Sequence, residues 1–372
     1  MLRKNRISFL NGFGLFALLV ICSFNAYAEK IRMGFLCPEP EDDPFWGPVV
    51  NVMRAAAKDL DVELIVNCSR RGSLATKRAG MSLLNTEPPL DYFITGYWPT
   101  VTKYHLELAN ERGIQTFAIN ANVREEDKAD IGKPRGRFKN WIGHMVPDDR
   151  QAAVTLTNFL LKRAAEARKK SKSDGIKMLA LIGNGASSIG RNRHDGMYSA
   201  VKAIPGAEVQ DVVGEYWVSD WSRDATVKAL QSSPGIDAIF GVNEAAAWGA
   251  VLGAEKAGRK PGKDIIIGGF DWNPDSLAAM ADDRLSASMF GHFLEGAWAL
   301  ILSYDHYYGY DFDKDPGVQI ATPFSVMTRD NYEQYRVILT KDYWDEVDFR
   351  KLSKKYNPEL KRYNLSISQF LK

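Results

Sequence analysis

Carboxylates and aromatic rings stand together at two places in the chain, Asp43-Pro44-Phe45-Trp46 and Phe270-Asp271-Trp272. Two carboxylates brought close, such as Asp43 and Asp271, could serve as the acid and base of a glycoside hydrolase. The five histidines show no pairing at metal-ligand spacing, and the chain contains no H-E-x-x-H, C-x-x-C or G-x-S-x-G motif. Apart from that carboxylate pair the sequence shows no catalytic apparatus and no metal site, so we expect binding without turnover.

A glycine-rich segment runs from Gly183 to Arg193 and suggests a phosphate-binding loop at first sight. It lacks Lys-Ser/Thr after its last glycine, and Ser188 stands where the dinucleotide fingerprint needs a glycine, so we expect no cofactor. Its two arginines allow two interpretations. Either both lie on the surface, or Arg193 points into a cleft, where a guanidinium donates paired hydrogen bonds to hydroxyls or a carboxylate.

The pair Phe45-Trp46 also allows two interpretations. Asp43 could cap the helix that follows while one ring pins its first turn. A helix start needs only one such anchor, whereas two adjacent rings must point in different directions, so one is predicted to face a ligand. Planar rings suit the apolar face of a sugar. Asn243 and Asp271, each at the end of an apolar run, could likewise cap the next helix or contact the ligand.

Short apolar runs alternate with helix-period segments from residue 31 onward, which is typical of strand–helix–strand repeats and parallel sheets. The segment 121–140 is polar and charged, and it is predicted to be a surface excursion. Two series of repeats follow one another. The predicted fold class is therefore α/β with two doubly wound parallel-sheet lobes, in which ligands collect at the carboxyl ends of strands.

The N-terminal residues carry an export signal: three basic residues, an apolar run over residues 13–22 and the ending Ala26-Tyr27-Ala28. This pattern predicts a leader over 1–28 that is cleaved after Ala28, and therefore a periplasmic protein; a lipoprotein based on Cys22 is the alternative. Without the three basic residues of the leader, 45 Lys and Arg face 46 Asp and Glu. That balance implies no nucleic-acid partner.

Two cysteines remain after the predicted cleavage. Cys37 ends the first strand pattern and Cys68 ends the second, so both are expected at one edge of a sheet if these strands are neighbours. In an oxidising compartment they could form a disulfide; two separate buried thiols are the alternative.

An ordered set of segments carries a family resemblance: D-P-F-W, SSIGRNRHDGM, SDWSRDA, AIFGVNEAAAWGA and DIIIGGFDWNPDSLAAM. With the leader, this set resembles the type I periplasmic binding proteins of the ribose and galactose class, over nearly the whole mature chain. In that family two lobes joined by three hinge strands close on a small ligand, commonly a sugar. Features of the autoinducer-binding sensory branch are also present, in the long segment after Asn120 and in R-x-D of RHD.

The resemblance implies a set of ligand contacts. By position, the residues that match the family's stacking and hydrogen-bonding contacts are Asp43, Phe45, Trp46, Asn120, Arg193, Trp221, Asn243 and Asp271. Three features depart from the pattern and leave the ligand open. Asn120-Ala121 replaces the common Asp-Arg, Phe290-Gly291-His292 stands where a glutamine is common, and the segment after Asn120 is long.

The resemblance also implies domains and partners. We expect an N-terminal lobe over 29–142 plus 292–322, a C-terminal lobe over 143–291 plus 323–341, and a C-terminal extension over 342–372, which could dock a partner or lie as a helix across one lobe. The expected function is solute binding for ABC-type import, with a membrane permease as partner. A co-receptor for a sensor kinase or cyclase is the alternative, and a monomer is the expected state.

Overall fold

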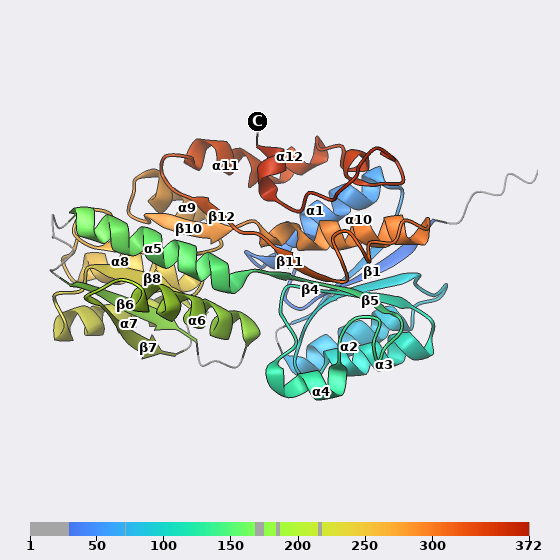
Figure 1. Ribbon diagram of the computed structural model, residues 1–372, viewed down its shortest axis with the longest axis horizontal. Coiled ribbons are helices and arrows are strands. Elements are labelled where there is room, and N and C mark those ends of the chain that lie inside the picture. The colour runs from blue at the N-terminus through green and yellow to red at the C-terminus, as the bar shows by residue number, and fades with distance from the viewer. Residues whose placement is uncertain (1–29, 71, 168–174, 184–186, 215–217, 372) are drawn as a thin grey trace, which may run out of the picture. The chain divides into compact units, whose positions relative to one another are not determined.

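Two six-stranded sheets organise the protein in the computed structural model, which describes residues 30–70, 72–167, 175–183, 187–214 and 218–371 (Figure 1). The first sheet has the order β11-β5-β4-β3-β1-β2 and the second has the order β12-β10-β9-β8-β6-β7. All strand pairs are parallel except β10–β12. The expected α/β fold with parallel-dominated sheets is confirmed. The predicted leader and Cys22 lie outside the described residues.

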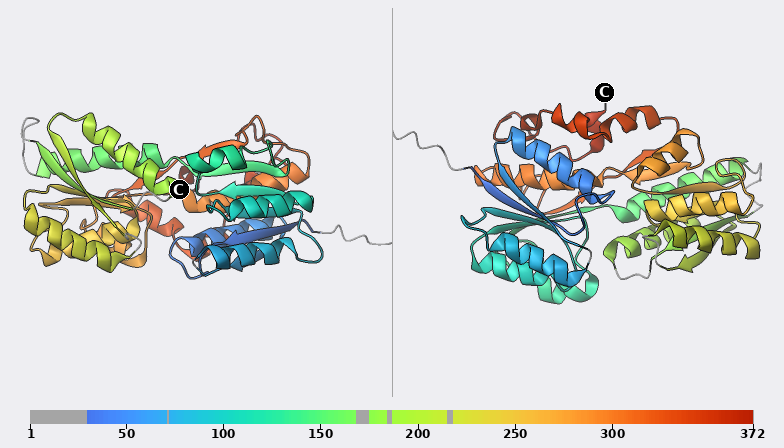
Figure 2. Two further views of the ribbon diagram at one scale, coloured as in Figure 1. Left: turned by 90° about the horizontal axis from the view of Figure 1, so that it is seen from below. Right: turned by 180° about the vertical axis from the view of Figure 1, so that it is seen from behind.

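The first sheet consists of β1 (Arg32–Cys37), β2 (Glu63–Cys68), β3 (Tyr92–Gly96), β4 (Gln115–Ile119), β5 (Trp141–Pro147) and β11 (Gln319–Thr322). Helices α1 (Trp46–Asp59) and α10 (Glu295–Tyr307) pack on one another, and so do α2 (Ser73–Leu84) and α3 (Thr102–Glu111). Figure 2 shows these helix pairs on opposite faces of the sheet. Because both faces are covered, a central strand such as β1 is apolar and buried along nearly its whole length.

The second sheet consists of β6 (Ile176–Ile182), β7 (Ala207–Val213), β8 (Ala238–Gly241), β9 (Ile266–Phe270), β10 (Ala287–Phe290) and β12 (Ser325–Met327). It is covered by α5 (Asp149–Ala167) with α6 (Ser188–Lys202) and by α7 (Ser219–Ser232) with α8 (Glu244–Lys256). The short α9 (Pro274–Ala281) follows β9. Small residues permit this close packing: a Cβ on Gly249 would lie 2.4 Å from the Ser219 carbonyl oxygen of α7.

Strand β5 belongs to the first sheet, although the sequence pattern placed it in the second half of the chain. It pairs with β4 from Trp141 to Met145 and with β11 from His144 to Pro147. The partner strand β11 was not predicted, because four residues with alternating exposure give a weak strand signal. We therefore propose that the boundary between the lobes follows residue 147 rather than 142.

The segment 121–140 is a packed element rather than a bare excursion. It contains a 3-10 turn at Glu125–Asp127 and the short helix α4 (Lys128–Ile131). Val123, Ile131 and Phe138 are buried against Tyr97 and Trp141 in a cluster of their own. These three apolar side chains anchor the segment, although many of its other residues are charged.

The C-terminal segment contacts elements of both sheets. It contains α11 (Tyr332–Ile338), α12 (Lys341–Asp345) and 3-10 turns at Phe349–Leu352 and Ile367–Phe370. Tyr335 packs against Phe290 of β10, whereas α12 and the turn after it pack on α1. Tyr335 precedes the predicted extension over 342–372, and the elements of that extension pack on α1, so the expectation that it lies across one lobe stays a prediction.

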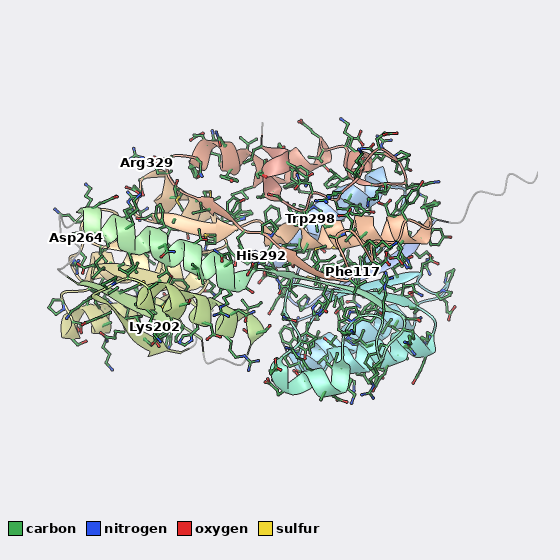
Figure 3. The ribbon with its side chains drawn as sticks, in the orientation of Figure 1. Phe117, Lys202, Asp264, His292, Trp298 and Arg329 are labelled. Carbon is green, nitrogen blue, oxygen red and sulfur yellow. The ribbon has the colours of Figure 1, made fainter. Side chains whose placement is uncertain are left out.

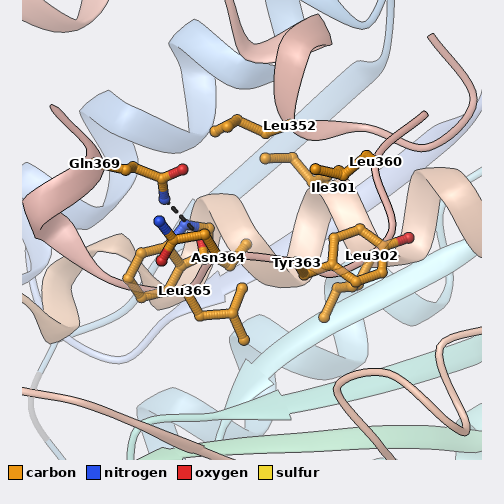
Figure 4. Close-up of a pocket in the computed structure, with 9 residues that line it drawn as sticks. Ile301, Leu302, Leu352, Leu360, Tyr363, Asn364, Leu365 and Gln369 are labelled. Carbon is orange, nitrogen blue, oxygen red and sulfur yellow. Dashed lines mark hydrogen bonds between the residues drawn. The ribbon is translucent and has the colours of Figure 1, made fainter. Parts of the chain in front are cut away.

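A small cavity of about 30 Å³ lies between α10 and this C-terminal segment, lined mainly by leucine and isoleucine side chains (Figure 4). Ligand pockets for small molecules are roughly ten times larger, so this space is a packing defect and not a sugar site. No helix in the described part of the chain has the length and apolar character needed to cross a membrane.

Candidate functional site

The loop between β1 and α1 places two aromatic rings on different partners. Asp43 accepts hydrogen bonds through Oδ1 from the backbone nitrogens of Phe45 (3.0 Å) and Trp46 (2.9 Å). Trp46 is buried and packs toward Phe35, with ring centroids 6.3 Å apart. Phe45 stacks instead on His292, with centroids 4.7 Å apart. One ring thus belongs to the core and the other to the proposed site, while Asp43 holds the turn between them.

His292 joins the two halves of this site, and Figure 3 labels it between the two sheets. It follows β10, and its ring lies 4.7 Å from the ring of Phe324 as well as on Phe45. Its Nε2 lies 3.4 Å from Oδ1 of Asp271, while Nδ1 has no hydrogen-bond partner among the described residues. Burial lowers the pKa of His292 well below its usual value, so the imidazole is neutral near pH 7.

Arg193 is buried at the centre of the second-sheet half. It is on α6, and its Nε donates to Asp149 Oδ1 (2.8 Å) while its Nη1 donates to the Val242 carbonyl oxygen (2.8 Å). The guanidinium carbon lies 3.9 Å from the centroid of the Phe270 ring. Arg193 therefore has a fixed position, set by an ion pair, a carbonyl and an aromatic face.

Three acids in this region, Asp149, Asp271 and Glu244, have raised pKa values. Burial raises the pKa of Asp271 to about 7 and that of Asp149 to about 6, although the Arg193 charge opposes both shifts. Burial also raises the pKa of Glu244 to about 7, and the nearby charge of Asp271 adds to the shift. A group of carboxyls that titrates near neutral pH is typical of functional sites and offers acceptors to hydroxyl groups.

Asn120 ends β4 in a left-handed conformation, with φ of 74°. Its backbone nitrogen donates to Oε2 of the buried Glu295 (3.0 Å), and Thr322 donates its hydroxyl to the other oxygen of the same carboxyl. Burial raises the pKa of Glu295 well above its usual value. The Glu295 carboxyl therefore ties together β4, β11 and α10 at the place where the chain passes between the sheets.

Asn243 and Trp221 have local roles in the structure. Asn243 is the N-cap of α8, and its amide oxygen accepts from the Ala246 nitrogen (2.8 Å). Trp221, on α7, is half-buried, and its ring lies so close to Gly214 that a Cβ there would be 2.1 Å away. For Asn243 the capping alternative is therefore realised, which leaves its amide nitrogen for a ligand.

Polar contacts also join the 121–140 segment to α6. The backbone nitrogen of Asn122 donates to the Ser188 hydroxyl (3.0 Å), and Arg191 forms an ion pair with Glu126 at 3.4 Å. The two arginines of the glycine-rich segment thus have different environments, since Arg191 is half-exposed and Arg193 is buried.

The structure joins Phe45, His292 and Asp271 by contacts and pairs Arg193 with Asp149, and the Phe324 ring lies near both His292 and the Arg193 guanidinium. The sequence arguments named Phe45, Asp271 and Arg193 as ligand contacts but missed Asp149 and Glu295 as partners in this region. Asp149 is the first residue of α5, two positions after the end of β5, so its place near a strand end was readable once β5 was assigned to its sheet. Glu295 carried a weaker signal, because an acid at the first position of a mostly apolar helix is also explained by the helix start.

Comparison with known proteins decides the family. Residues 33–306 match the family model described as the periplasmic binding protein domain. The chain belongs to the type I periplasmic binding protein family. Among curated relatives, the ribose import binding protein of Salmonella typhimurium is 24% identical over 188 residues, and that of Bacillus subtilis is 35% identical over 117 residues. These alignments cover 50% and 31% of this chain, and 54% and 36% of the relatives, so they span about half or less of the relatives' length.

Solved structures agree with this assignment along most of the chain. A periplasmic sugar-binding protein from Pseudomonas fluorescens is 26% identical and superimposes with a TM-score of 0.80, covering 92% of this family member and 100% of the other chain. The binding protein of an arabinose ABC transporter from Shewanella is 20% identical, with a TM-score of 0.67 over 81% of this chain and 93% of its own. At 20% identity, the similarity to the Shewanella protein shows a shared fold and no more.

Proposed function

We propose that this protein is an exported solute-binding protein that holds a sugar or sugar-like molecule and presents it to an ABC-type importer. The observation that supports this most directly is the Phe45 ring on His292, whose Nε2 lies 3.4 Å from Asp271, together with the buried ion pair of Arg193 and Asp149. A ring face suits the apolar side of a pyranose or furanose, and buried carboxyls and a guanidinium suit its hydroxyls. The named relatives and the Pseudomonas structure are ribose- and sugar-binding proteins, which favours the same ligand class.

Binding is proposed to occur without chemical conversion. Asp43 uses one carboxylate oxygen to cap the turn before α1, so it is held in place as a structural acceptor. We propose that the ligand contacts both sheets and favours the closed arrangement of the lobes, because its affinity for that state is greater. Docking on a sensor kinase stays a prediction, which neighbouring genes for a kinase rather than a permease would support.

The test is to identify the ligand that purifies with the protein. Small molecules released by denaturation are analysed by mass spectrometry, and each is then titrated by calorimetry together with ribose, arabinose and galactose. A sugar that binds tightly and is recovered unchanged supports the proposal. Recovery of a cleaved glycoside would support the hydrolase alternative, and no response to any sugar would contradict the ligand class.

A further inference from the structure

The two cysteines of the first sheet lie directly opposite one another. The register of the parallel pair β1–β2 runs from Arg32–Glu63 to Cys37–Cys68, so the thiols occupy the last paired position. Neighbouring strands are about 4.8 Å apart, and disulfides span Cα separations of about 4.4–6.8 Å. Residues opposite one another project from the same face of a sheet. Both sulfurs therefore lie on one side, at a separation that a disulfide can bridge.

The backbone around this pair is already tied together. The Ser69 nitrogen donates to the Cys37 carbonyl oxygen (2.8 Å), and the Ser69 hydroxyl donates to the Pro38 carbonyl oxygen (3.0 Å). These bonds fix the chain directly after both cysteines. A bond between the sulfurs would thus join two strand ends that are held side by side, and it needs only local adjustment of the side chains.

The two thiols differ in access and acidity. Cys37 is fully buried, with its sulfur 3.1 Å from the Glu39 carbonyl oxygen, whereas Cys68 is half-exposed. The hydrogen bond with Cys37 lowers the pKa of Cys68, and the nearby Arg54 charge acts in the same direction. A lowered pKa and an open approach are the features of a thiol that attacks a disulfide.

We propose that Cys37 and Cys68 are a modification site, at which a low-molecular-weight disulfide such as oxidised glutathione converts both thiols into an intramolecular disulfide. The Cys68 thiolate attacks the oxidant, forms a mixed disulfide and releases one thiol. Cys37 then attacks the Cys68 sulfur, and its proton passes to solvent while the second thiol leaves. Two cysteine thiols are oxidised and one disulfide is reduced to two thiols, so atoms and electrons balance.

The cross-link would enclose the loop that carries Asp43 and Phe45, helix α1 and β2 in one covalent ring that starts at the last residue of β1. It restricts the unfolded chain and so stabilises the folded one. The inference does not depend on which ligand is bound, and it is tested without one.

The experiment uses the full chain with Cys22→Ser, which leaves Cys37 and Cys68 as its two cysteines. The protein is treated with either oxidised glutathione or dithiothreitol, denatured, and alkylated with a maleimide. After oxidation we expect no alkylation, a mass lower by two hydrogen atoms, and a linked peptide pair that contains both cysteines. The oxidised protein should unfold about 3–8 °C above the reduced one.

Cys68→Ser in the same background is the matched variant. Cys68 is half-exposed at a strand end, so the variant is expected to fold, to lose the difference in Tm between the two treatments, and to keep Cys37 unmodified. Two alkylated thiols in the parent after oxidation would overturn the proposal. So would a stable glutathione adduct on Cys68 or a disulfide between two molecules. If the variant fails to fold, alkylation of the parent still decides the question.

Discussion

Arg193 is predicted from the sequence to contact the ligand, and it also has a structural role. In the structure its guanidinium is buried on Phe270 and paired with Asp149, whose carboxylate would be left without that charge if the arginine were lost. Loss of Arg193 is therefore expected to damage the fold, because removing one partner of a buried ion pair strongly destabilises a protein.

We expect Arg193→Ala to lower the free energy of unfolding by about 3 kcal/mol or more, measured by urea denaturation. Arg150→Ala, at an exposed position next to Asp149, is the control and should change stability by less than about 0.5 kcal/mol. Equal, small effects of both substitutions would show that the buried pair does not support the fold.

Asp271 supplies a prediction about pH. Its pKa is about 7 in the folded protein and near 4 in the unfolded chain, so the folded state binds more protons between these values. Stability from this group is thus fully present below about pH 4 and is lost as pH rises toward 7. We expect Asp271→Asn to reduce the loss of stability between pH 5 and pH 8 by about 2 kcal/mol relative to the parent.

Urea denaturation at the two pH values measures this difference. Asp275→Asn replaces an exposed carboxylate four residues further on and should leave the pH dependence as in the parent. Parallel pH profiles for the parent and Asp271→Asn would contradict the raised pKa.

At the scale of elements, the C-terminal segment is held by one carboxylate. Asp305 on α10 is fully buried and accepts hydrogen bonds from the Ser353 and Tyr363 hydroxyls and from the backbone nitrogens of Lys354 and Lys355. Buried apolar residues complete the attachment, with Trp344, Phe349 and Phe370 in mutual contact. The segment is therefore an integral part of the first-sheet region and not a loose tail.

We expect Asp305→Ala to lower the free energy of unfolding by about 2–4 kcal/mol, because four donors lose their acceptor. Trypsin should then cleave after Lys354 and Lys355 faster than in the parent. Mass spectrometry of the C-terminal fragments over time measures this rate. Asp313→Ala, at an exposed position, should digest like the parent. Unchanged cleavage in Asp305→Ala would mean that apolar packing alone holds the segment.

The predicted alternation of strands and helices agrees with the structure, because helix-period patterns bounded by clear turns are read from local sequence. Strand β11 and the partners of Arg193 were missed for a common physical reason. Each depends on residues far apart in the chain, such as β11 with β5 and Asp149 with Arg193, and no local pattern specifies such pairings.

At the scale of the whole molecule, the contacts between the 121–140 segment and α6 are proposed to influence ligand binding. The Glu126–Arg191 pair joins a first-sheet segment to a second-sheet helix. If the closed state binds ligand more tightly, loss of this pair shifts the equilibrium away from it. Exposed pairs contribute little, so we expect Glu126→Gln to weaken affinity by less than about fivefold, and the effect to shrink at high salt.

The change in affinity is measured by calorimetric titration at low and at high salt. The ligand titrated is the one that mass spectrometry identifies after its release from the purified protein. Glu125→Gln is the matched control, since Glu125 pairs with Lys128 of its own segment. An equal loss of affinity in both variants would indicate a general charge effect rather than a contact between lobes.

The path of the chain between the two sheets determines where its ends come to rest. It crosses after β5, after β10, between β11 and β12, and again between α11 and α12. Because the chain starts in the first sheet and crosses between the sheets four times, its last residues return to the helices of the first sheet. Fluorescent reporters placed directly before β1 and after the last 3-10 turn would thus lie on the same half of the protein and report little of a hinge motion. A biosensor built from this chain needs one reporter inserted among the surface loops of the second sheet.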